Sequence, residues 1–122
     1  MAGGIEDVFG DETKATDELI DRFYEHALRP GNRTIAREIL TLMEETASTE
    51  DDQGAIGIPE IKCPTLVMWG GVDIWIPTKL SEKWKKDLPS AKYIIYDGVG
   101  HCPHLEIPVK TAYDAHKFLS SK

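Results

Sequence analysis

The chain has 122 residues, a length that fits one domain or part of one. Hydrophobic residues make up 41% of it and charged residues 29%, which is ordinary for a soluble protein. Its formal net charge of −7 argues against nucleic acid or an anionic membrane surface as a partner.

The amino terminus and the cysteines indicate a cellular location. No apolar run approaches the roughly 18 residues that a membrane-spanning helix needs. Residues 1–7 have neither the basic nor the apolar region of a signal peptide. Without a secretory context, we interpret Cys63 and Cys102 as reduced thiols. We therefore expect a cytoplasmic protein that does not bind membranes.

The first half of the chain predicts two helices. Residues 1–13 are small, acidic and aperiodic, and we interpret them as a connector. Thr16 can cap a helix that Arg29-Pro30-Gly31 ends, and Asn32 can cap a second helix that runs to about Ala47. Apolar residues recur with the helical period in both, which predicts an αα-hairpin with one apolar face on each helix. These residues are Leu19, Ile20, Phe23, Tyr24, Ala27 and Leu28 in the first, and Ile35, Ala36, Ile39, Leu40 and Met43 in the second.

The second half predicts a strand–helix–strand unit. The run 48–54 holds three acids and reads as a solvated linker. An apolar strand follows at 65–69, then an amphipathic helix that Pro77 opens and Pro89 ends, then a second strand at 92–96. Because a helix links the strands, they should be parallel. Residues 1–54 thus form a cap-like helical hairpin with its linker, and residues 55–122 a βαβα core.

The last predicted helix begins at Pro108, a residue that favours the first helical position. Its expected buried side carries Val109, Ala112, Tyr113, His116 and Leu119.

Each predicted strand is followed by a glycine-rich turn that delivers one ionisable side chain. Asp73 follows Gly70-Gly71, and His101 follows Gly98-Val99-Gly100. The carboxyl ends of neighbouring parallel strands meet at one edge of a sheet, so these side chains should form an acid–base pair. Taken alone, a histidine or aspartate in such a turn is more often structural; their joint placement favours catalysis.

These motifs resemble the last third of an α/β-hydrolase, of the branch with esterases, C–C bond hydrolases and haloalkane dehalogenases. The resemblance lies in Trp69-Gly-Gly-Val-Asp73-Ile-Trp-Ile-Pro77, Pro89-Ser-Ala-Lys92 and Gly98-Val-Gly-His101-Cys-Pro-His-Leu-Glu106. It implies that Asp73 is the triad acid and His101 the triad base. Residues 8–11, 16–24 and 28–33 are similar to the helical cap of the same branch. The implied fold is therefore a partial α/β-hydrolase fold.

The chain departs from the family by lacking the nucleophile elbow Gly-x-Ser-x-Gly. None of its serines has flanking glycines at that spacing; they are Ser48, Ser81, Ser90, Ser120 and Ser121. One hypothesis is a split or truncated hydrolase, inactive alone, that acts on a small-molecule substrate only when a chain with the nucleophile complements it. The other is a non-catalytic, self-associating domain on a hydrolase scaffold. Either predicts association, because the strand 65–69 would have an open edge.

Three more residues allow two interpretations each. Trp75 follows the acid and either contacts substrate or packs against the protein. Glu106 either pairs with a backbone amide or, as we favour, is an acid at the start of the last helix. His101, Cys102 and His104 lie close together, but zinc needs a fourth ligand, so we expect neither a metal nor another cofactor.

Overall fold

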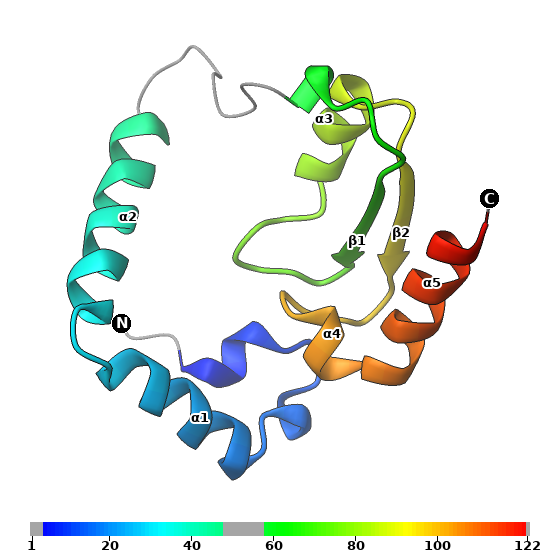
Figure 1. The fold of residues 1–122 in the computed structure, drawn as a ribbon. Coiled ribbons are helices and arrows are strands. Elements are labelled where there is room, and N and C mark those ends of the chain that lie inside the picture. Colours follow the sequence, from blue (N-terminus) through cyan, green and yellow to red (C-terminus); the bar gives the residue numbers. More distant parts are fainter. Residues whose placement is uncertain (1–3, 48–57, 122) are drawn as a thin grey trace. The chain divides into compact units, whose positions relative to one another are not determined.

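The computed structural model describes residues 4–47 and 58–121 (Figure 1). The chain forms two compact units, a core unit of Met1–Ala15 with Pro59–Lys122 and a helical unit of Thr16–Ile58. The division expected between residues 54 and 55 and the linker 48–54 lie outside the described residues. Residues 4–15, which the sequence assigned to the helical part, belong instead to the core unit.

The helical unit contains the two predicted helices, α1 (Asp17–Leu28) and α2 (Asn32–Ala47). The hydroxyl of Thr16 accepts a hydrogen bond from the Leu19 amide at 3.3 Å, as predicted for an N-cap. Gly31 has a φ of +87°, a conformation that glycine adopts without strain, and it turns the chain between the helices. Asn32 begins α2, and its side-chain amide donates to the carbonyl of His26 at 2.7 Å.

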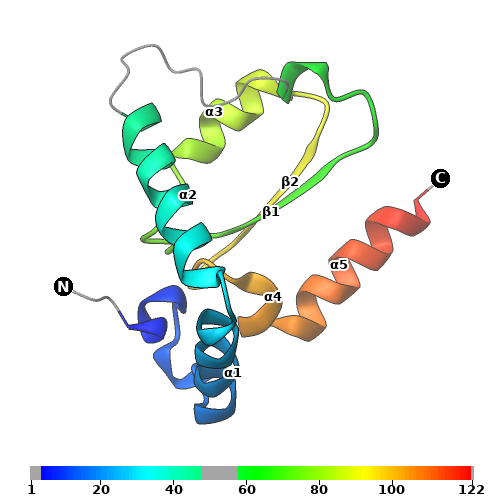
Figure 2. The same ribbon diagram turned by 60° about the vertical axis from the view of Figure 1, so that its left-hand side comes forward.

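The two helices are not packed along their lengths. Both views show α2 leading away from the end of α1 at an angle (Figures 1 and 2). No residue of α1 is buried, and the apolar stripe of α2 is exposed at Ile35 and Ile39. The two helices were therefore predicted correctly, and in the described residues their apolar sides are not buried.

The core unit contains the predicted parallel pair of strands. Strand β1 (Leu66–Gly70) pairs with β2 (Lys92–Tyr96), with Leu66 opposite Lys92 and Gly70 opposite Tyr96. Helix α3 (Leu80–Asp87) connects them and starts three residues after Pro77. Leu88 follows the last residue of α3. Its side chain is buried, and its carbonyl accepts a hydrogen bond from the Tyr93 hydroxyl at 3.0 Å. The strand–helix–strand prediction is confirmed.

Two helices follow the sheet, and the first of them was not predicted. They are α4 (Pro103–Glu106) and α5 (Pro108–Ser120). The hydroxyl of Tyr96 at the end of β2 donates to the Asp114 carboxylate at 2.9 Å. Burial, with a smaller contribution from Asp114, raises the pKa of Tyr96 to about 12. This phenol therefore stays protonated as a hydrogen-bond donor at neutral pH.

The contact with Tyr96 decides which side of α5 is buried. Thr111 and Asp114 are buried, whereas Val109, on the side predicted to be buried, is 84% exposed. The prediction was wrong because the polar partner of Tyr96 lies on the opposite side from the apolar stripe. The described core unit thus leaves an apolar helix surface open.

Residues 4–15 are part of the core unit and not a connector. They form 3₁₀ helices at Ile5–Val8 and Glu12–Lys14, and a third 3₁₀ helix lies at Ile58–Glu60. Phe9 is buried, and the carbonyl of Val8 accepts a hydrogen bond from the His101 amide at 2.7 Å. Among the described helices, none is long and apolar enough to cross a bilayer.

We expect Leu88→Ala to lower the free energy of unfolding by about 2–5 kcal/mol, because it leaves a cavity at a fully buried position. Urea denaturation followed by circular dichroism measures the change. The matched control is Leu119→Ala, at an exposed position of α5, which should change stability by less than about 0.5 kcal/mol. Equal effects of the two substitutions would contradict the assignment of the core.

Candidate functional site

The loops that follow β1 and β2 touch each other through their backbones. The amide of Gly71 donates to the Tyr96 carbonyl at 2.7 Å, and that of Val72 donates to the Val99 carbonyl at 3.0 Å. A methyl group on Gly70 would collide with the carbonyl oxygen of Gly100. Only glycine at this position allows such a close approach. The approach brings together the two turns that were predicted to carry the acid and the base.

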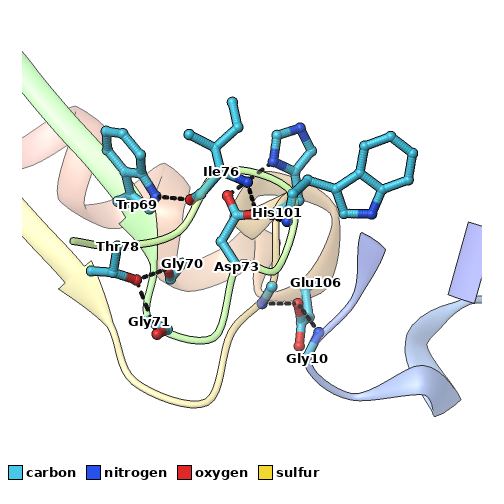
Figure 3. Close-up of polar contacts among 11 residues, drawn as sticks. Gly10, Trp69, Gly70, Gly71, Asp73, Ile76, Thr78, His101 and Glu106 are labelled. Carbon is cyan, nitrogen blue, oxygen red and sulfur yellow. Dashed lines mark hydrogen bonds and ion pairs between the residues drawn. The ribbon is translucent and has the colours of Figure 1, made fainter. Parts of the chain in front are cut away.

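Asp73 and His101 form a hydrogen-bonded pair at this junction (Figure 3). The carboxylate oxygen Oδ2 of Asp73 lies 2.9 Å from Nδ1 of His101. The other oxygen, Oδ1, accepts the backbone amides of Trp75 and Ile76, both at 2.9 Å. These two amides of its own loop fix the direction of the Asp73 side chain, which is only 4% exposed.

This geometry sets the tautomer of His101. An ionised carboxylate can only accept hydrogen bonds, so Nδ1 carries the proton and Nε2 of the neutral ring is left as the basic nitrogen. Within the described residues, Nε2 of His101 has no hydrogen-bond partner, and the side chain is 33% exposed. The pair can therefore accept a proton from a group outside it.

Two residues that the sequence did not single out hold the acid's loop in place. The indole Nε1 of Trp69 donates to the Ile76 carbonyl at 3.0 Å, and the hydroxyl of Thr78 donates to the carbonyls of Gly70 and Gly71, both at 3.0 Å. Figure 3 shows both contacts to the left of Asp73, on the side away from His101. Both residues lie within eight positions of their partners in the sequence. The shortness of this loop was therefore the signal that could have predicted the two contacts.

Glu106 is not an acid at the start of the last helix, the interpretation that the sequence favoured; it is the last residue of α4. Its side chain is buried, and Oε2 accepts the Gly100 amide at 2.8 Å. The alternative interpretation, pairing with backbone amides, is the one that the structure supports.

An open groove of about 310 Å³ borders the pair. Trp75 is not among the residues that line it; its ring is stacked on His101 with centroids 6.2 Å apart, and it is 56% exposed. The lining is mostly apolar apart from the acid and the base, as in small-molecule sites. It consists of Val67, Met68, Trp69, Gly70, Asp73, Ile76, Trp84 and His101.

The thiol of Cys102, next to His101, is half-buried near two carboxylates. Burial raises the pKa of the Cys102 thiol, and the charges of Asp73 and Glu106 raise it further. A protonated thiol is a poor metal ligand and a poor nucleophile. In the described parts of the chain, no three histidine, cysteine or acidic side chains are grouped as metal ligands would be.

We expect Asp73→Asn to reverse the tautomer of His101. The backbone amides of Trp75 and Ile76 would donate to the side-chain oxygen of the asparagine, so that the NH₂ group of the asparagine faces Nδ1 of His101. Nδ1 must then accept, and the proton moves to Nε2. Ring ¹⁵N chemical shifts at alkaline pH distinguish the two tautomers. The same substitution at the exposed Asp97 is the control, and an unchanged tautomer in Asp73→Asn would contradict the assigned contact.

The chain is similar in sequence to two bacterial lipases, although no protein-family profile matches it. It is 32% identical over 90 residues to Lipase 3 of Moraxella sp. strain TA144, covering 74% of this chain and 28% of the lipase. It is 33% identical over 79 residues to Lipase 1 of Psychrobacter immobilis, covering 65% of this chain and 25% of the lipase. The chain thus spans about a quarter of the length of the curated relatives it matches.

Solved structures show the same backbone arrangement. A serine hydrolase involved in carbazole degradation, the CarC enzyme, superposes with a TM-score of 0.81 over 97% of this chain and 45% of that chain, at 23% identity. A meta-cleavage product hydrolase, CumD, superposes with a TM-score of 0.68 over 97% of this chain and 44% of its own, at 21% identity. Together with the parallel strands and their terminal loops, these likenesses establish that the chain has a partial α/β-hydrolase fold.

Proposed function

We propose that this chain supplies the acid and the base of a hydrolase that cleaves esters or related bonds. The observation that carries the proposal is the 2.9 Å contact between Asp73 Oδ2 and His101 Nδ1, with the acid buried and the imidazole partly open to solvent. The sequence similarity to two lipases supports a hydrolase, and the lipid esters that their names imply are one candidate substrate class.

The proposed chemistry follows from the tautomer. Nε2 of His101 removes the proton of a nucleophile as that nucleophile attacks the carbonyl carbon, and Asp73 stabilises the imidazolium that forms. The imidazolium then returns the proton to the leaving alcohol as the C–O bond breaks. With a serine nucleophile, water activated by His101 hydrolyses the acyl intermediate in a second round of the same steps.

In this proposal the nucleophile lies outside these 122 residues. Of the serines in the described residues, Ser81 lies in α3 with a buried hydroxyl that has no hydrogen-bond partner, and Ser90 is exposed in the turn after α3. Ser120 and Ser121 lie at the end of α5 and contact His116 and Lys117. None of them pairs with His101. The partner would be the complementary part of a hydrolase with a serine or aspartate nucleophile, and the chain would be inactive alone.

Trp75 is the proposed substrate contact. Its exposed ring, stacked on His101, offers an apolar surface beside the basic nitrogen. We also propose a cytoplasmic location, in which the free thiols of Cys63 and Cys102 would stay reduced.

Co-expression with the part of Moraxella Lipase 3 that precedes the matched region tests the proposal. We expect p-nitrophenyl ester hydrolysis above that of either polypeptide alone. His101→Ala should lower the rate of this hydrolysis at least about a thousandfold, since the nucleophile and the acid of a triad contribute little without the base. His104→Ala, at an exposed position three residues away, is the matched control. Hydrolysis that survives His101→Ala would refute the proposed base.

A second candidate is a non-catalytic domain that associates with itself. Two observations favour it: in the described sheet each strand has one edge without a neighbouring strand, and the apolar side of α5 is exposed. A surface hollow of about 500 Å³ lies on this helix, lined by Ile107, Pro108, Val109, Lys110 and Tyr113. Open strand edges and apolar patches are both typical of surfaces that another chain covers.

We expect sedimentation equilibrium at micromolar concentration to give a mass of at least twice 13.6 kDa. Val109→Asp should shift the chain toward the monomer, because it places a charge on the open apolar side of α5. Lys117→Ala, also exposed on α5, should leave the mass unchanged. A stable wild-type monomer would rule out self-association.

A further inference from the structure

Glu106 joins the loop of the proposed base to the beginning of the chain. Its buried carboxylate accepts three backbone amides: Gly100 at 2.8 Å and Gly10 at 3.1 Å on Oε2, and Asp11 at 2.9 Å on Oε1. Figure 3 shows the contact between Glu106 and Gly10. One carboxylate therefore satisfies donors from two segments that lie about ninety residues apart.

The same two segments meet a second time at His101 itself. The amide of His101 donates to the Val8 carbonyl at 2.7 Å. A methyl group on Gly100 would lie 2.5 Å from both the Gly10 nitrogen and the Val8 oxygen, so the backbones are in direct contact. The peptide that carries the imidazole is thus held by Val8 at its own amide and by Glu106 at the preceding one.

Charge makes the Glu106 contacts stronger than ordinary ones. Hydrogen bonds to an ionised acceptor are roughly twice as strong as neutral pairs. A glutamine in this place would offer one neutral oxygen, and its NH₂ group would face a backbone donor. The substitution Glu106→Gln therefore keeps the shape of the side chain but removes the charge that strengthens its hydrogen bonds to the loop.

We propose that Glu106 is a positioning residue for His101, which fixes the Gly100–His101 peptide against residues 8–11 and so keeps Nδ1 at hydrogen-bond distance from Asp73. The importance of this role for catalysis rests on the proposed function. The role itself concerns only the orientation of the imidazole, which can be measured without any reaction.

The test compares the His101 tautomer in the full chain and in Glu106→Gln, using ring ¹⁵N shifts at alkaline pH. We expect the ratio of the Nδ1–H to the Nε2–H form to fall by about tenfold or more, because the bond to the Asp73 carboxylate is lost or lengthened. Glu60→Gln makes the same chemical change at an exposed position and should leave the ratio unchanged. The resonance of the Trp69 indole, which bonds to Ile76, reports that the acid's loop remains folded.

An unchanged tautomer ratio in a folded Glu106→Gln chain would overturn the proposal. If that variant does not fold, Glu106→Asp decides in the same way, since it keeps the charge but shortens its reach by one methylene group. In the complemented assay, Glu106→Gln should lower kcat by about a hundredfold with little change in KM, the effect of a misplaced catalytic group. A tautomer shift without hydrolysis in any complex would refute the proposed function and leave the positioning role standing.

Discussion

The hydrogen bond between Asp73 and His101 depends on two backbone turns that can approach because glycines replace side chains at the point of contact. Gly70 ends β1 directly against Gly100, and the amides after β1 bond to carbonyls after β2. Two parallel strands in register bring these turns to one edge of the sheet. The acid and the base are therefore neighbours because of the backbone, and their side chains need only short reaches.

Each oxygen of the Asp73 carboxylate has a separate task. One oxygen fixes the carboxylate to its own loop through two backbone amides, and this leaves the other pointing at the imidazole. Trp69 and Thr78 stabilise the same loop from outside. An orientation fixed by several independent contacts costs little reorganisation when charge develops on the ring, which is a general requirement of a catalytic acid–base pair.

The sequence predicted both strands, the four longer helices and the Asp73–His101 pair, but not α4, the 3₁₀ helices or the longer-range contacts. The strand Lys92–Tyr96 and the cap of α1 at Thr16 were predictable because local propensity and capping determine them. The buried side of α5 was not predictable, because it is determined by one hydrogen bond from the Tyr96 hydroxyl to Asp114 and not by the apolar stripe of the helix. Glu106 was misread because its partners are backbone amides as far as 96 positions away, and these leave no pattern in the side chains.

The link between Val8 and His101 has a consequence for how the molecule reaches its final form. During synthesis, residues 8–11 leave the ribosome well before the segment that they must contact exists. Contacts between such distant positions carry a large loop-closure entropy, and they form late in folding. The imidazole would then reach its working orientation only in the last stage of folding, after residues 8–11 and the loop of His101 have come together.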